Sequence, residues 1–293
     1  ETRTIEGVIT ESKSGRQAWL ARCVIDCSGD ADVAHLAGAP CHTWPVEERL
    51  GVTTVFGCAG VDKARFLEYA TVTHPKTYAD WTDGDSVDAD WNQTTSAKER
   101  DLGSPFLDFA EAKAQGILCG DDANIVGSWS SITDAGEATN LNLAHMKHVD
   151  ATNADHLTWA EMHGRKKAMR VIGALRATIP GFTHAKLRTF SSTIGVRDTR
   201  KIVGDYGLTR ADVTTEARFD DAVGVFPEFL DGYGTLMLPT TGRYFQVPRG
   251  CLLPKGIEGL LVAGRCVAGD KLSHAAMRNM MACTVTGQGA GIV

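Results

Sequence analysis

The sequence lacks the features that mark membrane, secreted and nucleic-acid-binding proteins. It contains no apolar run long enough to cross a bilayer, and its start shows no signal-peptide pattern. Its 30 Lys and Arg residues are outnumbered by 36 Asp and Glu residues, which gives a net charge of −6 and excludes the basic excess of a general nucleic-acid binder. With 43% hydrophobic residues, the composition predicts a globular protein that binds neither membranes nor nucleic acids.

Cysteine motifs are missing as well. None of the eight cysteines forms a C-x-x-C pair, which argues against a zinc ribbon and a thioredoxin-type motif. Cys23, Cys27, Cys266 and Cys283 lie in apolar runs, where a free thiol behaves as a small hydrophobic side chain. The pattern favours reduced, buried thiols in a cytoplasmic protein over a disulfide framework.

The length of 293 residues suits one large or two medium domains. The chain opens with Glu1 directly before a strand-like pattern at residues 4–10. A native start rarely falls at such a point. We therefore expect a longer protein, from which a preceding segment was cut or omitted.

Both ends of the chain show regular secondary-structure patterns. Residues 4–10 and 17–25 predict a β-hairpin, and residues 30–38 predict a helix with acidic residues in its first turn. Strand-like periodicity returns over residues 186–250, and residues 257–293 predict a strand, a loop and a helix.

The middle of the chain, residues 41–190, has a different character. Its spacing is irregular, and residues 80–101 form an acidic, loop-like stretch. One long helix is predicted at residues 157–176, where Thr158 and Glu161 fit a capping box. This part therefore resembles a lid or substrate domain inserted into another fold.

Two apolar strands end in residues that suit a bound phosphate. The run from Val24 ends at Ser28-Gly29-Asp30, and the run from Leu260 ends at Gly264-Arg265. A buried parallel strand that ends in glycine lets a ligand approach its backbone, and an arginine fork can hold a pyrophosphate. The alternatives are a plain strand–turn–helix connection, which we favour for the first segment taken alone, and a strand end with a surface arginine.

The final helix is expected to open with small residues around Ala282. A helix start presents free N–H groups and the positive end of the dipole, which stabilise an anionic cofactor group. Close packing of small residues is the alternative. The nearby Gly287-Gln-Gly289-Ala-Gly291 is not a dinucleotide fingerprint, because it lacks the last glycine and does not directly follow a strand.

His274 is the best single candidate for a proton donor or substrate ligand, since we expect it in the loop before the final helix, four residues from Arg278. A histidine that merely caps or packs is an equal alternative. Arg197 and Arg200 could bind a carboxylate or the cofactor, but in a strand they would face opposite sides. For both, and for Asp198 as their partner, surface ion pairing is the alternative.

His145 and His148 lie three residues apart on an expected helix. No carboxylate at matching spacing accompanies them, so the sequence predicts no metal site.

Four stretches, in order, resemble FAD-dependent oxidoreductases related to the flavoproteins of fumarate reductase and succinate dehydrogenase. They are residues 24–40, 194–206, 247–257 and 260–291, and the resemblance is weak between residues 60 and 140. It implies an α/β fold with a glutathione-reductase-type FAD-binding domain and an inserted α+β substrate domain. Residues 1–45 and 191–293 would form the FAD-binding domain, and residues 46–190 the substrate domain.

The resemblance also implies a set of cofactor-binding residues, each near one part of FAD. They are Val8, whose backbone meets the adenine; Ser28, Gly29 and Asp30, near the adenosine and pyrophosphate; Gly264 and Arg265, near the pyrophosphate and ribityl chain; and Cys283, Thr284 and Val285, on the helix that starts at the pyrimidine edge of the flavin.

The chain departs from the family pattern in two places. It lacks the N-terminal βαβ unit of about 30 residues with its G-x-G-x-x-G loop and acidic ribose ligand. The main phosphate cradle would then come from a missing N-terminal segment or from a partner chain. Asn279-Met-Met281 stands where relatives often show a Val-Met-Pro pattern, which leaves the substrate specificity open.

The function that the resemblance implies is that of an FAD-dependent dehydrogenase or reductase, which moves a hydride between flavin N5 and a small organic substrate. His274 would give or take the proton, and Arg197 or Arg278 would anchor the substrate. One alternative is a flavin-dependent monooxygenase, and another is the non-catalytic half of a split flavoprotein that needs a partner chain. A homo-oligomer is compatible with each.

Overall fold

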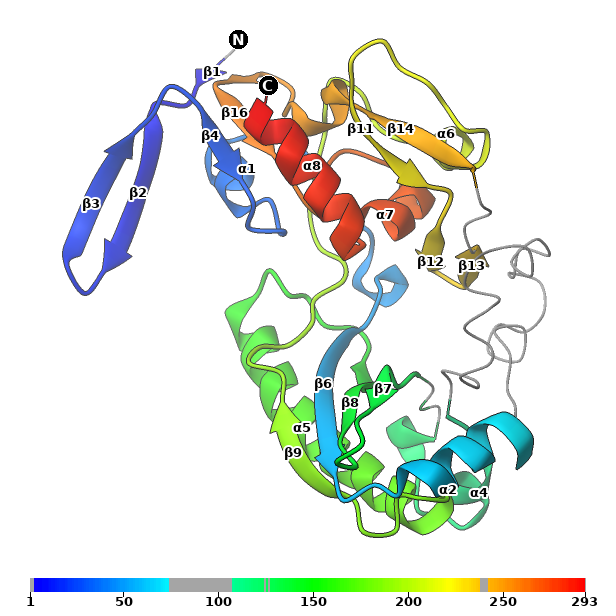
Figure 1. Ribbon diagram of the computed structural model, residues 1–293. Helices are drawn as coiled ribbons and strands as arrows, with labels where there is room; N and C mark the ends of the chain where they lie inside the picture. Colours follow the sequence, from blue (N-terminus) through cyan, green and yellow to red (C-terminus); the bar gives the residue numbers. More distant parts are fainter. Residues whose placement is uncertain (1–2, 74–106, 124, 126, 238–241, 293) are drawn as a thin grey trace. The chain divides into compact units, whose positions relative to one another are not determined.

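The computed structural model describes residues 3–73, 107–123, 125, 127–237 and 242–292 (Figure 1). The chain forms two compact units, of which unit 1 comprises residues 1–48 and 198–293 and unit 2 comprises residues 49–197. Both combine helices and strands, in agreement with an α/β fold. The assignment of one part to the cofactor and the other to the substrate stays a prediction, and the acidic stretch at 80–101 lies outside the described residues.

Parallel strands organise unit 1. β4 (Val24–Asp26) pairs in parallel with β16 (Leu260–Val262), and β1 (Arg3–Thr4) pairs in parallel with β15 (Ile257–Glu258). All three residues of β16 are buried, which explains its uninterrupted apolar sequence, since parallel strands are covered on both faces.

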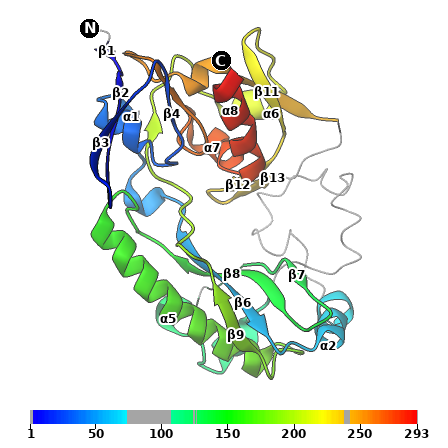
Figure 2. The same cartoon turned by 60° about the vertical axis from the view of Figure 1, so that its left-hand side comes forward.

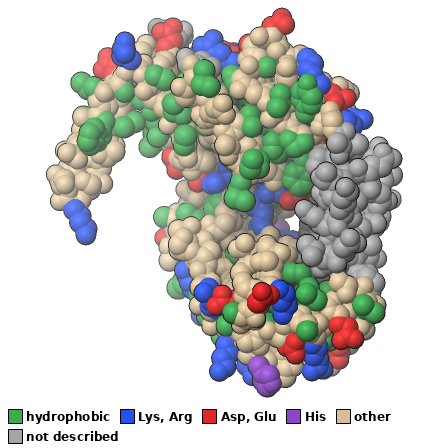
Figure 3. All heavy atoms as spheres, in the orientation of Figure 1, with side chains coloured by type: hydrophobic (Ala, Val, Ile, Leu, Met, Phe, Trp, Pro, Cys, Tyr) green, Lys and Arg blue, Asp and Glu red, His purple; other side chains and the backbone are tan. Residues whose placement is uncertain are grey.

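The predicted hairpin is present with shifted limits. β2 (Gly7–Ser12) pairs with β3 (Gly15–Leu20), so the second arm ends earlier than expected and residues 24–26 form β4 instead. Ile9, Trp19 and Leu20 are exposed, and hydrophobic side chains gather at the root of this hairpin (Figure 3).

The rest of unit 1 consists of short elements around a core that includes Phe245, Leu252 and Val262. β11 pairs with β14, β12 pairs with β13, and α8 packs against β11. These elements are α1 (Asp32–Leu36), β5 (Cys41–His42), η1 (Val46–Glu48), β10 (Lys201–Ile202), α6 (Arg210–Thr214), β11 (Ala222–Pro227), β12 (Leu230–Gly232), β13 (Thr235–Met237), β14 (Tyr244–Pro248), η6 (Arg249–Leu252), α7 (Lys271–Met277) and α8 (Met280–Ile292).

The end of the chain contains two helices where one was predicted. Asp270 caps α7, because its carboxylate accepts hydrogen bonds from the backbone of Leu272 and Ser273. His274 therefore lies in a helix, and the prediction that it lies in a loop is wrong.

Unit 2 is built on an antiparallel sheet with the strand order β7-β8-β6-β9, and α5 runs along one face of it (Figure 2). Phe56, Phe66 and Phe182 belong to the core of this unit. Its elements are β6 (Val52–Ala59), α2 (Lys63–Glu68), η2 (Tyr69–Thr73), α4 (Ala110–Ala114), η5 (Gly120–Asp122), β7 (Ser131–Ile132), β8 (Ala138–Met146), α5 (Ala154–Thr178) and β9 (Lys186–Phe190).

The long predicted helix is α5, but its cap differs from the prediction. Asn153 is the N-cap, and its side chain accepts hydrogen bonds from the backbone of Asp155 and His156. Thr158 lies inside the helix and donates its hydroxyl to the carbonyl of Ala154, so the capping box at Thr158 is wrong. Asn is favoured at the N-cap position because its side-chain oxygen accepts hydrogen bonds from the free backbone N–H groups of the first turn.

The side chains of β6 alternate between the two faces of the sheet. Phe56 and Cys58 pack in the core that includes α5, and Thr53 and Val55 are directed to the opposite face, here called the second face. His145 lies in β8 and His148 follows it with a positive φ of 59°, so the helix predicted for this pair is wrong.

All eight cysteines are free thiols. Cys266 is buried, but Cys23 and Cys27 are exposed, so the burial predicted for these two is wrong. Among the helices that the structure describes, none combines the length and the apolar character needed to cross a membrane.

Candidate functional site

The carboxyl end of β4 is fixed by a buried carboxylate. Asp26 is 1% exposed, and it accepts hydrogen bonds of 2.9 Å from the backbone N–H groups of Ser28 and Ala34. Its carbonyl accepts from Ala263, directly after β16. One side chain thus ties the strand end, the turn and α1 together. Ala31 enters α1 with a φ of 54° and without a side-chain cap.

The ends of β4 and β16 converge. Arg265 forms an ion pair of 2.5 Å with Asp30, whose same oxygen also accepts the hydroxyl of Thr199 at 2.5 Å. Gly29 has a φ of 78°, and a Cβ there would stand 2.6 Å from the Arg265 guanidinium. The structure therefore brings together the two motifs that were grouped from the sequence, and it shows why residue 29 is glycine.

Arg200 joins the same group. Its Nε donates to the carbonyl of Asp30 at 2.9 Å, and its guanidinium also pairs with Asp32. We call Asp30, Asp32, Arg200 and Arg265 the strand-end cluster. Its two arginines are balanced by two aspartates, so it offers directed N–H donors without a large net charge.

Three side chains in the first turns of α8 have different surroundings. Cys283 lies next to Gly264, with its sulfur 3.9 Å from the position of a Cβ at that glycine. Thr284 is exposed, and Val285 contacts Gly224 of β11. Burial raises the pKa of Cys283, although Arg265 and Arg278 partly offset it, so this thiol stays protonated at neutral pH. Of these three side chains, only Cys283 faces the strand end.

The second main feature of unit 1 is a buried polar network, formed by Asp198, Lys201, Tyr233 and His274. Asp198 and Lys201 are fully buried and form an ion pair. The phenol of Tyr233 donates to the second Asp198 oxygen at 2.7 Å, and Nε2 of His274, which is 3% exposed, lies 3.9 Å from Asp198. Lys201 also lies over the ring of Trp44, 5.5 Å from its centre.

Sequence reasoning missed the centre of this network. It considered Asp198 as a partner of Arg197 or Arg200, but the carboxylate pairs with Lys201. The three-residue spacing of Asp198 and Lys201 was the available signal. It was weak, because residues 198–200 are irregular and the other two members come from distant segments.

The surroundings shift the acidity of the network. Burial would raise the pKa of Asp198, but the charges of Lys201 and His274 and the hydrogen bonds from Lys201 and Tyr233 outweigh it, so this pKa lies below its usual value. Burial and the Asp198 carboxylate raise the pKa of Tyr233. Asp198 is thus a carboxylate, and Tyr233 a neutral donor, throughout the physiological range.

The lowered pKa of Asp198 predicts a loss of stability in acid. An unfolded aspartate has a pKa of about 3.9, so the unfolded chain takes up this proton first as the pH falls, and the stabilisation is lost as the pH passes through the lower folded value. We expect the difference in unfolding free energy between the parent and Asp198→Asn to be full above about pH 5 and to shrink below about pH 4. Denaturant unfolding at a series of pH values measures it, and a constant difference would contradict this assignment.

Arg278 lies at the end of α7. It forms an ion pair of 3.0 Å with Asp231 and donates to the carbonyl of the same residue. Its buried Nε has no hydrogen-bond partner in the described part of the chain. Arg278 therefore has one buried donor that is not satisfied by the described residues.

Arg197 belongs to unit 2 and not to a strand. Its guanidinium donates to the carbonyl of Gly51 at 2.8 Å, to the hydroxyl of Thr53 and to the side chain of Asn142 at 3.0 Å, and it lies 3.4 Å from Nε2 of His145. The strand considered for this stretch is not present at residues 197–200, so Arg197 and Arg200 do not lie on one strand. Arg197 joins β6 and β8 to the segment that leaves unit 2.

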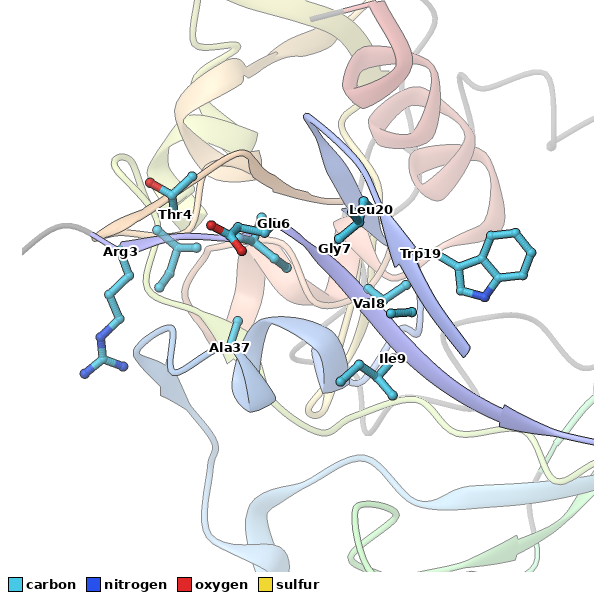
Figure 4. A pocket seen from close by; sticks show the side chains of 12 residues that line it. Arg3, Thr4, Glu6, Gly7, Val8, Ile9, Trp19, Leu20 and Ala37 are labelled. Atoms are coloured by element: carbon cyan, nitrogen blue, oxygen red, sulfur yellow. The ribbon is translucent and has the colours of Figure 1, made fainter. Parts of the chain in front are cut away.

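Val8 lines a hollow of about 430 Å³ at the root of the hairpin (Figure 4). Ile5, Ile9 and Trp19 contribute to its apolar wall, and Ala37, directly after α1, also lines it. This hollow is large and apolar enough for a flat aromatic ring.

Within the described ranges, no cluster of His, Cys, Asp and Glu could hold a metal ion.

Similarity to known proteins is found at the level of a protein family. A search of curated proteins and a search of solved structures found no match. The family model for FAD dependent oxidoreductase matches residues 1–293. The chain therefore belongs to the FAD-dependent oxidoreductase family, and its cofactor is FAD.

Proposed function

We propose that this chain is a dehydrogenase or reductase that moves a hydride between flavin N5 and a small organic substrate. The observation that carries the proposal is the convergence of β4 and β16 on the ion pair of Asp30 and Arg265, in a chain of an FAD-dependent family. The carboxyl ends of parallel strands are where open α/β sheets bind nucleotides.

The residues at these strand ends fit FAD. Gly264 has a φ of 89° and no atom closer than 3.9 Å to the place of its missing Cβ, so its backbone can be approached. The buried Nε of Arg265 has no hydrogen-bond partner among the described residues. The apolar hollow at Val8 suits the adenine. When bound, FAD supplies the redox chemistry, and the chain binds and orients it.

In this reaction the protein itself has two tasks, which are to give or take a proton and to hold the substrate. We assign the proton to His274, whose Nε2 lies 3.9 Å from the Asp198 carboxylate, and substrate anchoring to Arg278, which Asp231 holds at the end of α7. Arg197 is assigned a positioning role instead of a contact with substrate, because its guanidinium is already engaged by groups of β6 and β8.

The test is to purify the full chain, reconstitute it with FAD and follow flavin absorbance under anaerobic conditions with candidate substrates. A chain that binds no flavin contradicts the proposal. Flavin binding only after addition of an N-terminal segment or partner chain would favour the split flavoprotein, and oxygen consumption coupled to hydroxylation would favour a monooxygenase.

Replacing His274 by glutamine is expected to leave bound FAD in place and to slow its reduction by substrate by about 10²- to 10⁴-fold, the usual range for general acid–base catalysis. Stopped-flow absorbance measures the rate. His184→Gln is the matched control, because His184 is an exposed residue of unit 2. Equal rates in the two variants would rule His274 out.

A further inference from the structure

The outer face of α5 in unit 2 carries a regular row of exposed residues. Its spacing alternates between four and three residues, which is the spacing of a helix face that packs along another helix. The opposite face of α5 packs on the sheet through buried residues such as Ala168, Val171 and Leu175 (Figure 2). The exposed residues, here called the outer row, are Asp155, Trp159, Met162, Lys166, Met169, Gly173 and Arg176.

The middle of the outer row is largely apolar. Trp159 is 44% exposed, Met162 53% and Met169 50%. The indole of Trp159 stacks on the ring of His163, with ring centroids 4.2 Å apart and an angle of 21° between the planes. Large apolar side chains that gather on one exposed face mark an interaction surface, and methionine adapts its shape to a partner. This face of α5 therefore suits contact with another apolar helix face.

Gly173 is the member of the outer row that unit 2 itself does not explain. Glycine destabilises a helix interior relative to alanine, because it loses more backbone entropy on folding. A Cβ added at residue 173 would meet open space within the described part of the chain. The packing of unit 2 thus does not require a glycine there, whereas the bare backbone leaves room for a large side chain of another molecule.

We propose that α5 pairs with α5 of a second copy of this chain, in antiparallel orientation. A two-fold axis at Lys166 brings Trp159, seven residues before it, to the height of Gly173 of the second copy, seven residues after it. The bulky indole then lies over the backbone that has no side chain. Met162 and Met169 of the two copies meet at nearly the same height, four residues before and three residues after the axis.

The charges at the ends of the outer row favour the antiparallel orientation. Asp155 lies 11 residues before Lys166 and Arg176 lies ten residues after it, so opposite charges meet at both ends of the contact. A parallel pair would place like charges together. Lys166 meets its own copy at the axis, where its flexible stem can carry the ammonium group to solvent. A contact of one helix pair falls below the size of stable interfaces, about 1,200 Å², so we expect a dissociation constant on the order of 10 μM.

The test is sedimentation velocity of the full chain without added FAD, at concentrations from about 1 to about 200 μM. We expect a reversible shift from monomer to dimer. Trp159→Ala and Gly173→Leu should each raise the dissociation constant about tenfold or more. Leucine favours a helix more than glycine does, so a lost dimer in Gly173→Leu does not reflect a lost fold. Lys166→Met should lower the constant about threefold to tenfold, because a charged residue in a helix seam weakens association.

A charge exchange tests the orientation. Asp155→Arg and Arg176→Asp should each weaken the dimer, and the variant with both changes should restore it, while circular dichroism checks that α5 is kept. Trp19→Ala is the matched control, because Trp19 is an exposed tryptophan of unit 1. A chain that stays monomeric, a dimer that Trp159→Ala and Gly173→Leu leave unchanged, a dimer that Trp19→Ala weakens equally, or a charge exchange that restores nothing overturns the proposal. The inference depends on unit 2 alone, so its failure leaves the proposed flavin chemistry untouched.

Discussion

Replacing Asp198 with alanine is expected to lower the free energy of unfolding by about 3–5 kcal/mol. The side chains of Asp198 and Lys201 are fully buried, so the substitution leaves an ammonium group in the core without its counter-charge. The phenol of Tyr233 also loses its acceptor, and His274 loses the carboxylate beside it. Denaturant unfolding of the full chain, followed by circular dichroism, measures the change.

Two further variants distinguish the loss of the Asp198–Lys201 ion pair from the cost of a buried ammonium group that has lost its counter-charge. The double variant Asp198→Leu/Lys201→Met should recover most of the stability, because apolar residues often replace a buried ion pair at little cost. Asp205→Ala removes an exposed aspartate nearby and should change the stability by less than about 0.5 kcal/mol. An Asp198→Ala loss no larger than that of Asp205→Ala would show that the pair contributes nothing.

The parts of the fold that could be predicted from the sequence are those with a local signal. The ends of β4 and β16 were recognisable, because an apolar run that stops at glycine marks a buried strand and its turn. The long helix α5 of unit 2 was also found from a local pattern, although its cap was misplaced by a few residues. Short-range patterns of this kind depend on neighbours in the chain and hardly on tertiary contacts.

The parts that could not be predicted depend on contacts between distant segments. The helix α7 has only seven residues, which is too short to show a clear helical period in the sequence. The burial of His274 follows from Asp198 and Tyr233, which come from two other segments. The bulges at Asn140 and Arg188 depend on the register between strands, which no single strand encodes.

Replacing Arg265 with alanine is expected to raise the dissociation constant for FAD about 10- to 100-fold. Two causes act together. The variant loses the buried Nε donor at the end of β16, and among the described residues it leaves the carboxylate of Asp30 with the hydroxyl of Thr199 as its remaining side-chain partner. Fluorescence titration of the apoprotein with FAD measures the constant, and circular dichroism checks that the fold is kept.

A double variant distinguishes the two causes. If the unpaired Asp30 repels the phosphates, Arg265→Ala/Asp30→Asn should bind FAD more tightly than Arg265→Ala alone. If Arg265 itself contacts the pyrophosphate, the double variant should stay weak, and Arg265→Lys should be intermediate because lysine keeps the charge without the fork. Arg170→Ala in unit 2 is the control, since it also breaks an ion pair with an aspartate, but away from the strand ends. Wild-type affinity in Arg265→Ala would exclude the strand-end cluster from the cofactor site.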